Sequence, residues 1–217
     1  MINEDSTKQR ILMAAGPIFA ANGFRGATVR DISVAADVNL ASINYYFGDK
    51  QKLYVETVKI ARAMRMAEFP SPKPNPTADP EQSLEDYIRL LLNRLVPVKD
   101  APWQVVLLMR EFMKPTDACR ELIEEFMRPV FQILLRIVDR IVDGSLEQHQ
   151  QHKIGFSIIG QCLHYRCAAE TISMVVEPEE FEQFFDIEQL TQHITLFSLG
   201  AIQRLSQSTK PTTRSSN

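Results

Sequence analysis

TVRDISVAADVNLASINYYFGDKQK, residues 28–52, is the stretch that decides the fold of the N-terminal part of the chain. Thr28 can cap a short helix, and Asp31 stands three residues later, where an acidic side chain suits a helix N-terminus. Ile32 and Ala36 then recur at helical spacing. The stretch therefore begins with a short helix that has one apolar face.

A turn and a second helix follow this first helix. Asp37 and Asn39 can make local backbone hydrogen bonds that compete with helix, so a tight turn is expected here. Asn39 can cap a second helix from Leu40 to about Phe47, in which Ile43 and Phe47 face inward. Two short helices joined by a turn of roughly three or four residues form a helix-turn-helix.

The outward side of the second helix carries groups that suit base edges and phosphates. They are the small residue Ala41, the hydroxyl of Ser42, the amide of Asn44 and the phenols of Tyr45 and Tyr46. Gly48 can end the helix, and Lys50 and Lys52 add positive charge beside it. The alternative is two ordinary packed helices with a polar surface, because this geometry also occurs in proteins that bind no DNA.

The segment GATVRDISVAADVNLASINYYFGDKQKLY resembles the N-terminal signature of the tetracycline-repressor (TetR) family of bacterial transcription regulators. The resemblance covers about residues 7–66. It includes the preceding ILMAAGPIFAANGFRGATV, the aromatic pair before Phe47, and the Lys-x-x-Leu at Lys50 and Leu53. The resemblance implies a DNA-binding regulator rather than an enzyme.

The resemblance also implies roles for individual residues. Thr28 and one of Tyr45 and Tyr46 would contact phosphates, and Lys50 the DNA backbone. Ser42 and Asn44 would lie near bases. The full set of implied DNA-binding residues is Thr28, Arg30, Asn39, Leu40, Ala41, Ser42, Asn44, Tyr45, Tyr46 and Lys50. Most members have glycine where this chain has Ala41, and a basic or polar residue is common at Leu40; both departures bear on the operator sequence.

Composition indicates an all-α protein without a membrane segment. The chain has 217 residues, 45% of them hydrophobic, and only eight glycines. No apolar run reaches the roughly 20 residues that a membrane span needs, and the polar start MINEDSTKQR lacks a signal-peptide core. We therefore expect a cytoplasmic protein, and its three cysteines fit a reducing compartment.

The net charge of −3 is unevenly distributed. Residues 1–69 hold nine Lys and Arg against seven Asp and Glu, whereas the remaining residues hold 15 against 20. Local field matters more than total charge for binding a polyanion. The slightly basic N-terminal part is therefore compatible with DNA binding.

The order of motifs predicts about nine helices in two domains. Residues 1–69 form the DNA-binding domain, ending in a long helix from Asp49 to about Phe69 that links the two domains. Residues 70–82 contain five prolines and read as an extended linker. Residues 83–206 form a helical ligand-binding and dimerisation domain, and residues 207–217 a disordered polar tail.

The last two long helices are expected at about residues 146–176 and 187–205. The apolar stripe of the second is predicted to be Leu190, Ile194, Phe197, Ala201 and Leu205. Phe181, Phe184 and Phe185, in the acidic segment between them, are expected to tuck against the bundle. The phrases REFMKPTDAC, EEFMRPVF and IIGQCLHYRCA resemble a TetR-family C-terminal domain found with efflux and drug-sensitivity regulators, which implies a homodimer through these two helices.

Polar groups stand among large apolar ones in the middle helices and predict a ligand cavity. The candidate ligand-binding residues are Trp103, Met109, Arg110, Met113, Gln161, His164 and Tyr165. Alternatively, these polar groups satisfy one another or bridge the dimer. A Met-rich and aromatic lining suits a flat, apolar or amphipathic effector.

Motifs for catalysis, metal binding or a cofactor do not emerge. His164 and Cys167 share a helical face at i, i+3, but two ligands do not make a metal site. The sequence favours a homodimeric repressor released from a near-palindromic operator by a small molecule. Two alternatives stay open: a DNA-binding regulator controlled by a protein partner or by redox at Cys162 or Cys167, and a helical binding protein without DNA recognition.

Overall fold

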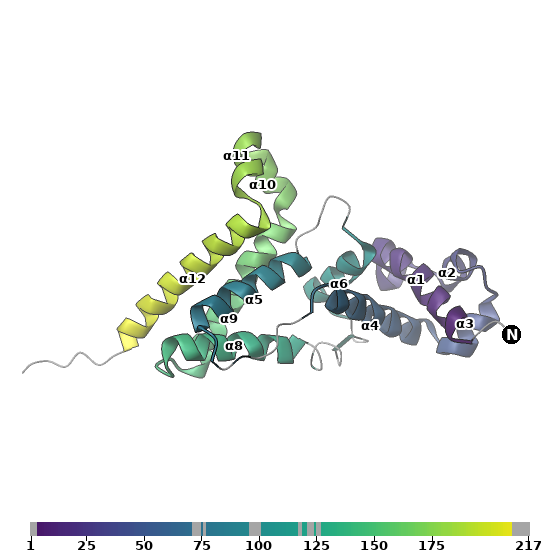
Figure 1. The fold of residues 1–217 in the computed structure, drawn as a ribbon. Helices are drawn as coiled ribbons and strands as arrows, with labels where there is room; N and C mark the ends of the chain where they lie inside the picture. The colour runs from purple at the N-terminus through teal and green to yellow at the C-terminus, as the bar shows by residue number, and fades with distance from the viewer. Residues whose placement is uncertain are drawn as a thin grey trace, which may run out of the picture. The chain divides into compact units, whose positions relative to one another are not determined.

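The computed structural model describes residues 4–70, 75, 77–95, 101–116, 119–120, 124 and 127–209, with residues 4–5, 166–167 and 208–209 described by their backbone alone. Every regular element in these ranges is a helix, which confirms the predicted all-α class (Figure 1). Parts of the predicted linker and of the predicted tail lie outside the described residues.

The described residues form eleven helices. They are α1 (Glu4–Gly26), α2 (Val29–Ala35), α3 (Leu40–Phe47), α4 (Lys50–Glu68), α5 (Pro80–Leu95), α6 (Trp103–Met113), α8 (Arg128–Val142), α9 (Gln148–Cys167), α10 (Ala169–Val175), α11 (Pro178–Phe184) and α12 (Ile187–Thr209). The predicted number of helices, about nine, was too low, partly because the single helix predicted at residues 146–176 is divided into α9 and α10. Its backbone breaks at Ala168, which separates α9 from α10, and the acidic connector that follows contains α11.

Contacts divide the chain into two compact units. The first joins residues 1–70 with residues 97–127, and the second joins residues 71–96 with residues 128–217. The first unit therefore contains α1–α4 and also α6, a helix that the sequence had placed with the C-terminal domain. The functional limits drawn from the sequence, at 70–82 and 83–206, stay a prediction.

The core of the first unit surrounds the helix-turn-helix. Ile11, Ala15 and Phe19 of α1 are fully buried, and Leu53 and Ala61 of α4 are buried with them. Ile43 and Phe47 complete this core from α3. The short helices α2 and α3 are thus held by burial of their apolar sides, since helices of this length are marginal in isolation.

Helix α6 packs against α1 through a glycine. A Cβ atom at Gly16 would lie 2.5 Å from ring carbons of Trp103, so only a glycine lets this indole approach the helix so closely. The candidate ligand residue Trp103 is accordingly half-buried within the first unit.

The second unit is a bundle of α5, α8, α9 and α12 with its own core. Leu84, Ile88, Leu134 and Ile158 are among its buried side chains. At its surface, Arg89 of α5 binds both carboxylate oxygens of Glu188 of α12 at 3.0 Å. This bidentate pair raises the pKa of Arg89 and lowers the pKa of Glu188, because each charge stabilises the other.

The predicted stripe of α12 is correct at its start and wrong further along. Leu190 and Ile194 are buried, but Phe197 is 62% exposed, Leu205 is 39% exposed and Ala201 is exposed. The buried row instead continues through Ser198 and Ile202. Helix α12 therefore carries a second apolar row that the bundle of the second unit does not cover.

We expect Gly16→Ala to destabilise the first unit by about 1–2 kcal/mol, because overpacking costs more than the helix propensity gained. Thermal unfolding followed by circular dichroism would measure the change. In a Trp103→Leu background the same substitution should cost nothing or be stabilising. An equal cost in both backgrounds would show that the indole is not what limits position 16.

Candidate nucleic-acid interface

The first helix of the motif, α2, begins at a side-chain cap. The Thr28 hydroxyl oxygen accepts a hydrogen bond from the backbone N–H of Asp31 at 3.1 Å. The same hydroxyl donates to the Asp31 carboxylate at 2.6 Å. This reciprocal pair confirms the predicted start of the helix, and it leaves Thr28 exposed at the end of α2.

The turn between α2 and α3 is held by main-chain hydrogen bonds. The N–H groups of Asp37 and Val38 donate to the carbonyls of Val34 and Ser33, at 3.1 and 3.0 Å. Asp37 has φ of 50°, a left-handed conformation that aspartate tolerates better than most residues. The turn predicted from Asp37 and Asn39 is therefore confirmed.

The second helix, α3, is capped twice by one side chain. The Asn39 carboxamide oxygen accepts from the Ser42 N–H at 2.7 Å and from the Ser42 hydroxyl at 2.9 Å. Gly48, with φ of 77°, closes the helix as the sequence predicted. These two ends hold an eight-residue helix whose first turn presents its small side chains to solvent.

The exposed side of α3 carries the residues that the resemblance implied. Tyr45 is 75% exposed and Leu40 47% exposed. Thr28, Arg30, Asn39, Ala41 and Asn44 are exposed as well, whereas Ser42, Tyr46 and Lys50 are half-buried. All ten are accessible on the surface of the first unit, and their contact with DNA stays a prediction.

Aromatic rings orient two of the cations on this surface. The Lys50 Nζ atom lies 4.9 Å from the centroid of the Phe24 ring, and the Lys8 Nζ atom lies 5.9 Å from that of Phe47. Both distances are within the range of cation–π attraction. The half-exposed Lys50 is therefore positioned by packing.

Lys8, Arg10 and Lys52 are basic residues of this surface that the candidate set omitted. An Arg10 guanidinium nitrogen donates to the Asp37 carbonyl at 3.4 Å, which brings α1 to the turn. Lys52 is exposed beside Gly48. The sequence signalled Lys52 by its position, but nothing local indicates that the start of α1 lies against the motif.

A buried polar contact joins α4 to α6. The Tyr54 hydroxyl donates to the Glu111 carboxylate, whose other oxygen accepts from the Thr116 N–H at 2.9 Å and from its hydroxyl at 3.1 Å. Burial, then the bond to Glu111, raises the pKa of Tyr54. The Tyr54 ring in turn lies 5.2 Å from that of Phe24, centroid to centroid.

Arg110 of α6 binds the main chain of α1. Its guanidinium donates to the carbonyls of Ala20 and Ala21 at 2.8 and 2.7 Å. These carbonyls are free to accept because the helical backbone is interrupted at Gly23, which has φ of 68°. Arg110 thus caps the main part of α1, a role that the sequence had not assigned to this candidate ligand residue.

The seven candidate ligand-binding residues fall into different units. Trp103, Met109, Arg110 and Met113 lie on α6 in the first unit, and Gln161, His164 and Tyr165 lie on α9 in the second. Met113 is 68% exposed. Ligand binding by these residues stays a prediction.

His164 and Tyr165 line an open groove of about 340 Å³ in the second unit. Its other walls come from α10 and the segments beside it, and they are almost entirely apolar. They are Ala168, Thr171, Ile172, Val175, Val176 and Phe185. The groove is in the size range of a small-molecule site.

Among the described residues, no three His, Cys, Asp or Glu side chains gather in a way that could hold a metal ion. Within the same ranges, no helix has the length and apolar character to cross a membrane.

Two family models match the sequence. Residues 11–57 match the model described as bacterial regulatory proteins, tetR family. Residues 80–202, more than half of the chain, match the model described as HTH-type transcriptional dual regulator CecR, C-terminal domain. The predicted resemblance is thereby confirmed at both ends of the chain.

Individual relatives agree with these matches. The HTH-type transcriptional dual regulator CecR of Shigella flexneri is 26% identical over 221 residues, which cover 94% of this chain and 96% of that protein. The HTH-type transcriptional repressor NicS of Pseudomonas putida is 35% identical over 88 residues, 40% of this chain and 41% of NicS. The crystal structure of HlyIIR, a hemolysin II transcriptional regulator, shares the fold, with a TM-score of 0.58 at 19% identity over 89% of this chain and 99% of that chain.

Removal of the Asn39 cap should loosen α3. Asn39→Ala removes both hydrogen bonds to Ser42 and should lower the free energy of unfolding by about 1 kcal/mol, whereas Asn39→Asp keeps a cap of equal strength. Urea unfolding of the two variants would measure the difference. If the alanine variant is as stable as the aspartate variant, the cap does not hold the helix.

Proposed function

Because this chain belongs to the TetR family of bacterial regulatory proteins and carries a CecR-type C-terminal domain, we propose that it is a repressor that binds a near-palindromic operator as a homodimer and is released by a small-molecule effector. The family and the relatives described above are transcriptional regulators, not enzymes. What is proposed is the sign of regulation, the dimer, the operator symmetry and the response to a ligand.

The observation that carries the proposal is the surface of α3. Its apolar residues Ile43 and Phe47 are buried, its N-terminus is capped by Asn39, and its polar side chains face solvent. A helix presented in this way can enter the major groove with its first turn near base edges. Ser42 and Asn44 are proposed to read bases, while Thr28, Tyr45 and Lys50 hold phosphates.

The charges around α3 support binding to a polyanion. Two acidic residues of this region stand at helix starts: the Asp31 carboxylate accepts from the Thr28 hydroxyl in the first turn of α2, and the Asp49 carboxylate accepts from the Lys52 N–H at the start of α4. Their charge is partly compensated by the dipoles of those helices. Lys8, Arg10, Arg30, Lys50 and Lys52 are then the cations available to the DNA backbone.

Exposed apolar side chains on α9 and α12 support the homodimer. Phe156 of α9 is 63% exposed, and Leu196 and Phe197 of α12 are 76% and 62% exposed. Large apolar side chains exposed on two neighbouring helices commonly mark an interface between proteins. Two copies joined here can present two α3 helices to half-sites about one helical turn apart.

An effector is proposed to act through the helices of the C-terminal part. The apolar groove beside His164 and Tyr165 supports a small apolar or amphipathic ligand. The ligand would favour a dimer in which the spacing between the two α3 helices does not match the operator, so the affinity for DNA falls.

Helix α6 supplies a physical route for such a change within the first unit. The Glu111 carboxylate accepts a hydrogen bond from Tyr54, and the Tyr54 ring contacts the Phe24 ring. The Lys50 ammonium group lies over the same Phe24 ring. Arg110 of the same helix binds the end of α1 beside Gly23. A displacement of α6 would therefore alter the positions of α1 and of Lys50 together.

The structure disfavours one alternative, redox control at Cys162. Burial raises the pKa of the Cys162 thiol to about 12, and a protonated, buried thiol is a poor nucleophile. Cys167, the other cysteine of that hypothesis, has its side chain outside the described residues. Control by a protein partner stays an alternative, and binding to genomic DNA fragments tests the loss of DNA recognition.

Residues proposed to read bases and residues proposed to hold phosphates should behave differently. Asn44→Ala should reduce the preference for one operator sequence over its variants. Lys50→Ala should lower the affinity for every DNA sequence about equally, and it should reduce the slope of log affinity against log salt concentration by about one. Mobility shifts and fluorescence anisotropy with genomic fragments, at several salt concentrations, would measure both effects.

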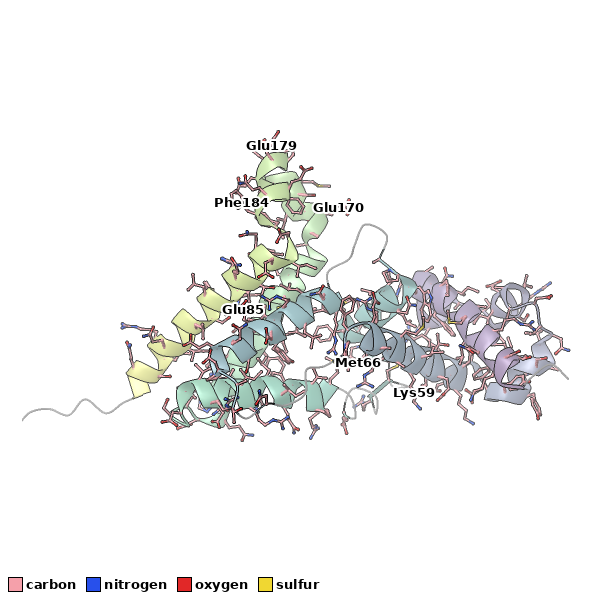
Figure 2. All side chains as sticks on the ribbon, in the orientation of Figure 1. Lys59, Met66, Glu85, Glu170, Glu179 and Phe184 are labelled. Carbon is pink, nitrogen blue, oxygen red and sulfur yellow. The ribbon has the colours of Figure 1, made fainter. Side chains whose placement is uncertain are left out.

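Lys59→Ala is the matched control for Lys50→Ala. Lys59 lies further along α4 (Figure 2), where it pairs with Glu56 at 3.0 Å, so its removal should leave DNA affinity unchanged. If the unaltered protein binds no genomic fragment even at low salt, the proposed function is wrong and the reading as a helical binding protein gains support.

The cysteines allow a direct test of the redox alternative. In a Cys167→Ser variant, Cys119 and Cys162 should not react with a thiol reagent at pH 8, because burial raises the pKa of each to about 12. Both should react in urea. Rapid labelling of Cys162 in the folded protein, with loss of DNA binding, would instead support control by redox.

A further inference from the structure

Helices α10 and α11 form a projecting pair, here called the arm, which comprises residues 169–184. Within the second unit, the arm stands away from the bundle of α5, α8, α9 and α12 (Figure 1). Each helix has seven residues, and neither contains a buried residue. Helices of this length depend on packing for their stability, so further cover on the exposed side of the arm would stabilise it.

Exposed apolar side chains show which part of the arm needs that cover. Met174 and Val175 of α10 are 75% and 80% exposed, and Phe184 of α11 is 51% exposed. Figure 2 shows Phe184 on the arm together with Glu170 and Glu179. Phe184 had been expected to tuck against the bundle. Phe185 does so, because it packs against the core of the second unit, and Phe181 stacks on Phe185.

A series of ring contacts connects the arm with the exposed row of α12. Phe181 stacks on Phe185 with centroids 5.3 Å apart, and Phe185 lies 6.2 Å from Tyr165. Tyr165 and Phe197 both lie 6.4 Å from His193. These ring contacts therefore lead from Phe181 of the arm to Phe197 of α12, on the side where the homodimer is proposed.

Charge limits the kind of surface that can cover the arm. Residues 168–203 contain seven Asp and Glu and no Lys or Arg. An acidic segment of this kind is repelled by DNA and by anionic lipid. An apolar protein surface is what remains, and a two-fold dimer offers each copy the same apolar row on α12 of the other.

We propose that the arm of each protomer packs on the second copy of the chain and extends the dimer interface beyond α9 and α12. This inference rests on the proposed homodimer. Met174, Val175 and Phe184 become buried in the dimer, and the two short helices become ordered by that contact. The arm is thus a clasp between protomers.

Site-specific photo-crosslinking tests the clasp. A photoreactive phenylalanine analogue replaces Met174 in one sample and Leu196 in another, and neither position lines the apolar groove. Irradiation of the full-length protein followed by mass spectrometry identifies the crosslinked residues. Crosslinks from both positions to the second copy are expected, as judged with mixed isotopically labelled protomers.

The two positions separate failure of the clasp from failure of the dimer. Crosslinks between copies from position 196 but not from position 174 would overturn the clasp and leave the dimer standing. Crosslinks from position 174 alone would support the clasp and relocate the dimer interface. Crosslinks between copies from neither position, or from position 174 only to its own chain or to another protein, would overturn the clasp.

Substitutions measure how much the clasp contributes. Met174→Glu should raise the dimer dissociation constant at least about tenfold, because it places a charge in an apolar contact. Met174→Leu should change it by less than about threefold, since volume and polarity are kept. Sedimentation velocity measures the constants, and circular dichroism checks the fold. An unchanged constant in a folded Met174→Glu variant would overturn the clasp.

Discussion

The buried hydrogen bond between Tyr54 and Glu111 is the interaction on which the first unit depends. Tyr54 is 1% exposed and Glu111 is 6% exposed, so each would be costly to bury without the other. The bond holds α6 against α4, and Trp103 and Arg110 hold the same helix against α1. Helix α6, which lies within the range of the CecR-type C-terminal model, therefore packs with the helix-turn-helix in the first unit.

The helix-turn-helix could be predicted in detail because its signals are local. Thr28, Asn39 and Asp49 each cap a helix through the N–H of the residue three positions later. Such bonds need no information from the rest of the chain. The position of α6 could not be predicted, since Tyr54 and Glu111 are 57 residues apart. Several apolar helices of this sequence could have packed against α4 in place of α6. Because α6 is the one that does, the candidate ligand residues are divided between the two units.

Helix α12 shows a different limit of prediction. A helix that is apolar on one side has a single buried stripe, and its period can be read from the sequence. Helix α12 is apolar on two sides, with Ile194 and Ile202 in the core of the second unit and Leu196 and Phe197 in solvent. The sequence alone does not tell which of two apolar rows on a helix is buried in the core of its own unit. The exposed row is nevertheless informative, because large apolar side chains gathered on one helix face support the proposed homodimer.

Two cations of the surface proposed to bind DNA are held over aromatic rings in the protein alone. Lys50 lies over Phe24 and Lys8 over Phe47, and a side chain already restricted in this way loses less entropy when it binds a phosphate. Phe24 also packs on Tyr54, the residue bonded to α6. The placement of Lys50 thus depends on a helix far away in the sequence. The geometry of the surface proposed to bind DNA is therefore set by the packing of the whole first unit and not by the helix-turn-helix alone.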